Sequence, residues 1–490
     1  MSVTRRVFLG STAAFAGTSA LAALEAPAKK PAPAKAPVPS QKPAPKKPAP
    51  LPPEPPTFET ADGQATANVL GRRLMLDLLG RIPSKEEALG FGAALKNRAA
   101  FVDKLLSSDG FADYWSMHFC DILRVKSEFP INLWPNAVYV YHRRIRAFVQ
   151  KDEPWTQFAR SLLLATGSDF RDAEVNFLRA TARRTPEGFA EVAALTFLGW
   201  QWQEVPAARQ KELASYFACV RIKNTREWKE EIVQVEGPDR RAAFVKRLFG
   251  EWRNAFATAF VKRVDWWLLG RTEADPEHVK IFVKNGFRLR PLVRAIVLSR
   301  AYCRGSVTGG FPVRRLDAEI LDDAIHQFTS TPRAYQSIAP EPFTFLPKDR
   351  PSILIEDGSI SNAFLSLFGR PARDTGLPQE RNTDVTTKQR LYLFNSGKLH
   401  GLLARLVGPA KANPALLPPF GERVNDLYWK LLGRPPMPHE RQAIMRLWRK
   451  RGGLPGPNRR NKKFRTPRPF GTLLDVAWCL VNTKEFLFRV

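Results

Sequence analysis

One helix ending recurs three times in this chain, and it constrains the fold more than any other feature of the sequence. The motif Leu-Leu-Gly-Arg stands at 78–81, 268–271 and 431–434. A glycine after a run of apolar residues at helical spacing ends a helix in the left-handed conformation, and a nearby proline keeps the helix from resuming. Each copy therefore predicts a helix that ends at its glycine and is followed by a second helix.

A second motif follows each copy: two apolar residues, any residue, Ser or Thr, two more residues and an aromatic one. It spans 105–111, 296–302 and 480–486, so the paired motifs are 27, 28 and 49 residues apart. We interpret the recurrence as repeated helical modules. A chance recurrence in a leucine-rich helical protein is the alternative. The additional residues in the third copy coincide with a basic segment, which we predict to be an insertion at 446–470.

The periodicity from residue 61 onward is mostly helical, and it predicts a mainly α, multi-helical fold. Short strands are expected only in the C-terminal half, at 343–346 and 352–355, where apolar residues lie between prolines. A length of 490 residues is sufficient for two or three domains. We predict one helical domain at 58–240 and a second at 241–490.

The first 26 residues are predicted to be an export signal. Arg5-Arg6 precede Phe8-Leu9 and a dilute, Ala-rich apolar run, a pattern that resembles the signal of the twin-arginine pathway. An uncleaved membrane anchor is the alternative, although the run is short for a bilayer span. We expect a periplasmic or envelope-associated protein whose mature chain has no transmembrane span.

A proline-rich segment follows the predicted signal. Residues 27–57 contain 13 of the 41 prolines, interleaved with Ala and Lys. Proline removes backbone donors and favours the extended polyproline conformation. We therefore predict a disordered, semi-rigid tether that holds the helical body away from a surface.

Positive charge is concentrated in one segment near the C-terminus. The whole chain has a net charge of +29, and residues 446–468 alone contain ten Lys and Arg and no acidic residue. Such a segment predicts salt-sensitive binding to an anionic polymer or an envelope surface, and a solvated loop is the alternative. The candidate contacts are Arg449, Lys450, Arg451, Arg459, Arg460, Lys462 and Lys463.

Two sets of side chains are the candidates for chemistry. His118 and Asp121 are three residues apart, so they share a helix face on which a carboxylate can orient an imidazole. Arg370, Arg373 and Arg381 can bind an anionic group, and Glu380 beside them is a candidate acid or base. A structural His–Asp pair and internal ion pairs are the alternatives.

No established cofactor or metal motif is present in the sequence. The four cysteines, at 120, 219, 303 and 479, form neither a Cys-x-x-Cys nor a Cys-x-x-Cys-His pattern, so we predict no metal, no haem and no other cofactor. The cysteines allow three disulfide pairings or four free thiols.

The ordered motifs along residues 65–490 resemble the paired planctomycete cytochrome-associated domains of unknown function, DUF1549 and DUF1553. Family members often carry a Cys-x-x-Cys-His segment late in the first domain, and the corresponding stretch here, 198–204, lacks it. The resemblance implies helical architecture and export, and it implies no activity. The residues that carry it are Arg73-Leu74, Asp77 to Gly80, Trp115, His118, Asp121 and 154–158 for the first domain, and 299–302, 314–319, 368–373, Glu380-Arg381 and 482–486 for the second.

Three functions fit these observations. The first is a non-catalytic exported component of cell-envelope or polysaccharide-handling assemblies, which binds an anionic polymer, an envelope surface or a protein partner. The second is an enzyme that acts on sulfated or carboxylated glycans, and the third is a haem-free accessory of an envelope redox system. Export removes nucleic acid from the expected partners.

Overall fold

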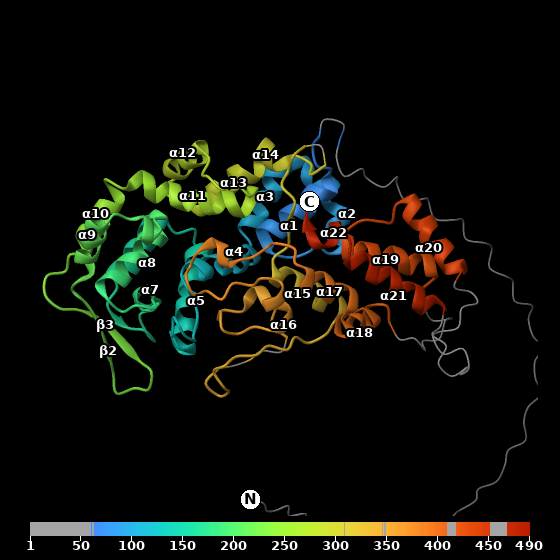
Figure 1. Ribbon diagram of the computed structural model, residues 1–490. Coiled ribbons are helices and arrows are strands. Elements are labelled where there is room, and N and C mark those ends of the chain that lie inside the picture. The colour runs from blue at the N-terminus through green and yellow to red at the C-terminus, as the bar shows by residue number, and fades with distance from the viewer. Residues whose placement is uncertain are drawn as a thin grey trace, which may run out of the picture. The chain divides into compact units, whose positions relative to one another are not determined.

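Helices make up most of the described chain, as the periodicity predicts (Figure 1). The computed structural model describes residues 60, 63–307, 309–344, 346, 349–408, 418–450 and 468–490. The predicted signal, the predicted tether and residues 451–467 of the predicted basic insertion lie outside these residues. The segment Glu54–Val490 is one compact unit.

The α-helices of the first half begin and end as follows: α1 (Ala67–Leu79), α2 (Lys85–Ala94), α3 (Arg98–Leu106), α4 (Asp109–Ile122), α5 (Pro135–Gln150), α6 (Trp155–Leu164), α7 (Asn176–Arg179), α8 (Pro186–Leu198) and α9 (Ala207–Phe217). Those of the second half are α10 (Arg241–Phe249), α11 (Arg253–Leu269), α12 (Pro276–Lys284), α13 (Leu289–Leu298), α14 (Arg300–Cys303), α15 (Ala318–Thr329), α16 (Ala363–Leu367), α17 (Thr387–Asn395), α18 (Gly397–Leu406), α19 (Phe420–Leu432), α20 (Pro438–Lys450), α21 (Arg468–Val481) and α22 (Lys484–Leu487). Short 3-10 helices are η1 (Leu95–Asn97), η2 (Ala173–Val175), η3 (Trp202–Glu204), η4 (Ser352–Leu354) and η5 (Pro378–Glu380).

The recurring glycine ends a helix in all three copies. Helices α1, α11 and α19 end at Gly80, Gly270 and Gly433, whose φ angles of 63°, 66° and 70° are left-handed. Each glycine amide donates to the carbonyl four residues earlier, which satisfies one of the free carbonyls of the last turn. The next helices, α2, α12 and α20, then begin within a few residues.

The second motif forms the same helix cap in each copy. The hydroxyls of Ser108, Ser299 and Thr483 accept hydrogen bonds from the amides of the aromatic residues three positions later, at 3.2–3.3 Å. This is the N-cap that a Ser or Thr provides to a new helix. The three aromatic side chains, Phe111, Tyr302 and Phe486, are fully buried.

Residues that follow each of the three Leu-Leu-Gly-Arg motifs bind to helix α1. The carboxylate of Asp77 accepts hydrogen bonds from the Tyr302 hydroxyl at 2.8 Å and from Nη1 of Arg489 at 3.0 Å. Its backbone carbonyl accepts one from Nε1 of Trp115 at 3.2 Å. Residues from after the first, second and third copies therefore converge on one buried aspartate.

Strands are few in the described chain, and the two predicted ones are wrong. Residues 352–354 form the helix η4, and residues 341–344 form a turn. The prolines at 340, 342 and 351 cannot donate to a strand ladder, and the amides of Ser352 and Ile353 donate to the carboxylate of Asp323 instead.

The observed strands belong to two small antiparallel sheets. In the first half, β1 (Gly167–Ser168), β3 (Glu231–Val235) and β2 (Val220–Asn224) form a sheet in that order. In the second half, β4 (Arg314–Arg315) pairs with β5 (Phe488–Arg489). The sheet of the second half is short, as expected, but the longest strands lie in the first half.

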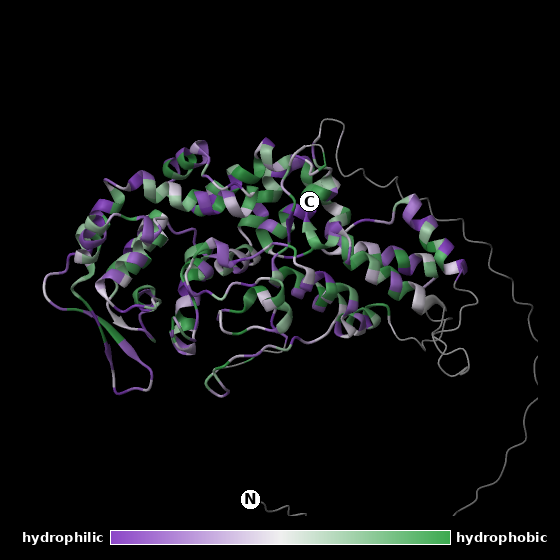
Figure 2. Ribbon diagram, viewed as in Figure 1, coloured by the Kyte–Doolittle hydropathy of each residue, from purple (hydrophilic) through white to green (hydrophobic). Residues whose placement is uncertain are grey.

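Apolar side chains from nearly all helices form one hydrophobic core, and Figure 2 shows where hydrophobic residues lie along the helices. Rings of Phe119, Trp155 and Phe260 lie at its centre, with centroids 5.1–6.0 Å apart. Among the residues that the structure describes, none of the helices has the length and apolar character needed to cross a bilayer.

Candidate functional site

The structure brings the two predicted sets of chemical side chains into one buried cluster. His118 and Asp121 lie on α4, and Arg370, Arg373 and Arg381 lie on the segment between α16 and α17. We call these five residues, together with Glu319 of α15 and Asp317 at its N-cap, the buried charge cluster.

His118 lies in an aromatic environment within this cluster. Its ring stacks on Trp267, with a centroid distance of 4.7 Å, and meets the edge of Tyr114 at 4.9 Å. The side chain is 3% exposed. Burial, assisted by the positive charge of Arg381, lowers the pKa of His118 to about 4. The imidazole is therefore neutral at pH 7, and a substrate in solvent does not reach it.

Asp121 binds arginines of the second half. Its carboxylate accepts a hydrogen bond from Nε of Arg373 at 2.8 Å and two from Arg381, at 3.0 and 2.8 Å. Arg381 also donates to both oxygens of Glu319, at 2.8 and 3.0 Å. The two arginines hold the pKa of Asp121 below its ordinary value, although burial alone would raise it.

Charges within the cluster are balanced by the chain itself. Arg370 lies 3.4 Å from Glu319. The side chains of Arg370, Arg373 and Arg381 are 2%, 1% and 10% exposed. Three guanidinium groups thus face the three carboxylates of Asp121, Asp317 and Glu319, and the cluster joins α4 of the first half to α15 and the following segment of the second.

The remaining predicted residues lie apart from one another. The Glu380 carboxylate accepts from the amide and hydroxyl of Thr375, both at 2.7 Å, and so holds a turn. Arg449 and Lys450 are exposed at the end of α20. The other predicted cations, Arg451, Arg459, Arg460, Lys462 and Lys463, lie outside the described residues.

The cysteines are free, and the described part of the chain contains no group of three or more His, Cys, Asp or Glu that could hold a metal ion. Cys120, Cys219 and Cys303 are buried, and Cys479 is exposed. Burial raises the pKa of the Cys120 thiol to about 12, so this thiol is unreactive.

Three aromatic rings that the sequence did not single out form an exposed cluster. We call Trp134, Trp228 and Phe343 the aromatic platform. Ring centroids are 4.9 Å apart for Trp134 and Trp228, 4.8 Å for Trp228 and Phe343, and 6.0 Å for Trp134 and Phe343. Trp228 is 59% and Phe343 is 45% exposed. The rings come from the start of α5, the turn between β2 and β3, and the 341–344 turn.

A polar pocket of about 380 Å³ adjoins the platform. Asn132, Asn224, Arg226, Glu227 and Lys229 line it together with Trp134 and Trp228. Nζ of Lys229 lies 5.4 Å from the centroid of Trp134 and 6.0 Å from that of Trp228, which is within cation–π range.

The carboxylates that line this pocket have partners within the chain. Glu227 pairs with Arg171 at 3.1 Å, and Glu230 accepts from the Thr225 hydroxyl at 2.8 Å. Glu231 pairs with Arg179 and Arg184. No carboxylate of the described chain lies within ion-pair distance of Arg226 or Lys229, so these two cations supply the uncompensated charge beside the platform.

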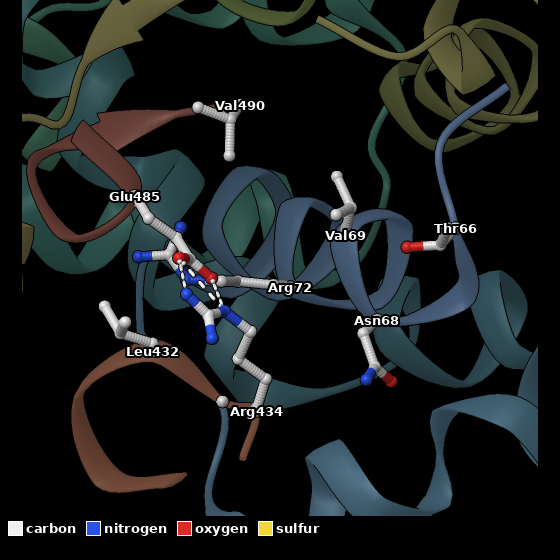
Figure 3. A pocket seen from close by; sticks show the side chains of 9 residues that line it. Thr66, Asn68, Val69, Arg72, Leu432, Arg434, Glu485 and Val490 are labelled. Carbon is white, nitrogen blue, oxygen red and sulfur yellow. Dashed lines mark hydrogen bonds and ion pairs between the residues drawn. The ribbon is translucent and has the colours of Figure 1, made fainter. Parts of the chain in front are cut away.

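A further cavity lies between α1 and the end of α19 (Figure 3). Arg72 and Arg434 point into it, and Arg434 binds Glu485 at 2.8 Å. The volume of about 20 Å³ is that of a single water site. This cavity is therefore too small for an organic ligand.

Comparison with known proteins confirms the resemblance found in the sequence. The family PSCyt2, described as a protein of unknown function (DUF1549), matches residues 59–249, and the family PSD1, described as a protein of unknown function (DUF1553), matches residues 232–448. Neither a curated protein nor a solved structure matches the chain. The division predicted at 240/241 stays a prediction.

Proposed function

We propose that this chain, which carries the DUF1549 and DUF1553 domains in tandem, is an exported, non-catalytic component of the cell envelope that binds an acidic polysaccharide. The aromatic platform is the observation that carries the proposal. The pocket beside it supplies the polar and cationic groups.

Aromatic side chains suit the apolar faces of sugar rings. The C–H groups of a pyranose face pack against the negative face of an indole or phenyl ring, and each covered Å² contributes about 25 cal/mol. Trp228 offers such a face because more than half of its side chain is exposed. Contacts among the three rings hold them in place before a ligand arrives, which lowers the entropy lost on binding.

Acidic sugars are favoured by the charge beside the platform. Arg226 and Lys229 line the pocket without carboxylate partners in the described chain, so they can bind carboxylate or sulfate groups. Asn132 and Asn224 can donate to and accept from sugar hydroxyls. The basic insertion at 446–470 is part of the proposal as a second contact, because of its ten cations.

Burial of His118 and Asp121 supports binding rather than catalysis. An enzyme that used His118 and Asp121 would have to expose them to a glycan, yet their polar atoms face arginines and aromatic rings inside the fold. Opening the buried charge cluster would separate several ion pairs and leave charges unpaired in the interior.

Binding to defined polysaccharides tests the proposal. Isothermal titration calorimetry with the full chain would use polygalacturonate, dextran sulfate and neutral dextran. We expect the acidic polymers to bind and Trp228→Ala to weaken this binding at least tenfold, because Trp228 is the most exposed ring of the platform. Phe394→Ala is the matched control, since Phe394 is 54% exposed on α17, outside the platform, and it should bind like wild type.

A variant without the two cations distinguishes their contribution to binding from that of the aromatic platform. Arg226→Gln/Lys229→Gln should weaken binding to the acidic polymers and reduce its dependence on salt, because fewer counterions are released. Wild-type affinity in Trp228→Ala, or binding to anionic phospholipid vesicles in place of every polymer, would overturn the glycan proposal. Release of new reducing ends by the full chain would overturn its non-catalytic part.

Export is a separate part of the proposal, and the predicted signal at residues 1–26 carries it. Arg5→Lys/Arg6→Lys keeps the charge but removes the paired guanidinium groups. We expect this variant to stay inside the cell while the wild-type chain is exported. Equal export of both chains, measured by fractionation, would contradict transport through the twin-arginine pathway.

A further inference from the structure

Two adjoining cavities form a second groove, away from the aromatic platform. Their volumes are about 360 and 320 Å³, and Leu195, Gln201 and Leu377 line both. We call the combined space the Arg124 groove. One wall comes from the end of α8 and the segment after it, and another comes from residues 374–379. None of its lining residues lines the platform pocket.

Two buried arginines lie in the walls of this groove. Arg124 and Arg263 are 2% and 7% exposed. Arg124 donates from Nε to the carbonyl of Ala180 at 2.7 Å and from Nη1 to that of Ile122 at 3.3 Å. Arg263 donates to the carbonyls of Thr196 and Leu195, both at 2.7 Å. Within the described chain, the hydrogen-bond partners of both arginines are therefore neutral carbonyl groups.

Arg124 has an unused donor as well. Its Nη2 is buried and has no hydrogen-bond partner in the described chain. Among the described residues, no carboxylate lies within ion-pair distance of Arg124 or Arg263. Burial lowers the pKa of each to about 10, so both guanidinium groups remain charged at pH 7.

The other charged side chains that line the groove form ion pairs within the chain. Arg183 pairs with Glu191, Asp374 with Lys126 at 2.6 Å, Glu273 with Lys262 at 3.1 Å, and Arg271 with Asp275 at 2.6 Å. Within the described chain, Arg124 and Arg263 therefore have no carboxylate at ion-pair distance, and Glu380 and Glu191 act on Arg124 only from farther away. A buried, unpaired cation is costly, and an anion bound beside it offsets part of that cost.

We propose that the Arg124 groove binds an organic acid, whose carboxylate or sulfonate pairs with Arg124 and whose apolar part lies along the groove. Trp202, Trp266 and Leu377 line the groove and supply the apolar surface. This site does not depend on the glycan proposal.

The segment 375–377 closes Arg124 off from solvent. Gly376 packs so closely that a Cβ there would lie 2.8 Å from Nη1 of Arg124 and 2.6 Å from the carbonyl of Ile122. Because Gly376 packs against this guanidinium group, we expect a ligand oxygen that reaches Nη2 to shift part of the segment. Binding should change the hydrogen exchange of the amides at 375–377.

Small aromatic acids test the groove directly. Isothermal titration calorimetry of the full chain would use benzoate, benzenesulfonate and the neutral analogue benzamide. We expect benzamide to bind at least tenfold more weakly than whichever acid binds better, and a comparison of the two acids identifies the preferred group. Arg124→Gln should abolish the difference between acid and amide, whereas Arg294→Gln, which removes an exposed cation that lines neither cavity, should retain it.

Hydrogen exchange of the wild-type chain keeps the test decisive if Arg124→Gln does not fold. At saturating benzoate or benzenesulfonate, exchange at 375–377 should change at least threefold, and exchange at the aromatic platform should not. Equal affinities for acid and amide, unchanged exchange at 375–377, or undiminished acid binding by a folded Arg124→Gln would overturn the proposal. Loss of polysaccharide binding in Trp228→Ala would bear only on the platform.

Discussion

Removing Arg381 should destabilise the fold more than removing an arginine from any surface ion pair. Arg381 binds Asp121 and Glu319 through four hydrogen bonds of 2.8–3.0 Å, and Asp317 lies 3.8 Å away. Arg381→Met keeps much of the side-chain volume but leaves the carboxylates without this cation. Breaking a buried ion pair by removing one partner costs about 3–5 kcal/mol. We expect the upper part of that range, because two carboxylates lose their bidentate partner.

Arg294→Met is the matched control. Arg294 also binds a carboxylate through two hydrogen bonds, to Asp103 at 2.6 and 3.1 Å, but the two side chains are 44% and 51% exposed. Exposed pairs contribute about 0–1 kcal/mol. The free energy of unfolding, measured by urea denaturation at pH 7, should therefore fall several times more in Arg381→Met than in Arg294→Met.

The dependence of this difference on pH tests the electrostatic cause. The pKa of Asp317 is lowered to about 2, mainly by Arg381 acting against burial. A carboxylate with a lowered pKa stabilises the fold above its ordinary pKa near 3.8, and that contribution is lost as pH falls toward 2. Without Arg381 the carboxylates regain protons at higher pH, so the destabilisation should shrink between pH 7 and pH 4. A loss equal to that of Arg294→Met, or one that is the same at both pH values, would refute the electrostatic reasoning.

Three further outcomes follow from the packing. Burial lowers the pKa of His118 from 6.5 to about 4, so the free energy of unfolding should fall by up to about 3 kcal/mol as pH falls from 6.5 to 4. His118→Gln should remove this dependence on pH, as measured by urea denaturation. Gly80→Ala should lower the midpoint of thermal unfolding far more than Gly433→Ala. Both positions have left-handed backbone, which costs an alanine about 1 kcal/mol. A Cβ at 80 would also lie 2.2 Å from the Tyr114 ring, whereas the nearest atoms to a Cβ at 433 are 3.7 Å away. Ellman's reagent should label one thiol of the native protein rapidly, that of Cys479, and all four only after unfolding; rapid labelling of two or more native thiols would contradict the burial of the others.

Local sequence was sufficient to predict the helical fold and many helix ends. The interactions that end a helix at Gly80 or begin one after Ser108 join residues within four positions of each other, so the chemistry is visible in the order of residues. Local sequence was also sufficient to recognise the two families, because short motifs in a fixed order identify them. The strand prediction at 352–355 failed because contacts with Asp323, distant in sequence, decide the conformation at 352–353.

The sequence placed His118 beside Asp121 and grouped the arginines of 370–381, but only the tertiary structure decided what these residues bind. Asp121 and Arg381 form an ion pair although they are 260 positions apart in the sequence. This pair connects the first half of the chain to the second inside the fold. Likewise, nothing local distinguishes Trp228 and Phe343 from core aromatic residues, since exposure depends on which surfaces the folded chain leaves uncovered. Composition and periodicity determined the helices of this protein, whereas long-range packing decided which charges are compensated inside the fold and which rings and cations remain free to bind a ligand.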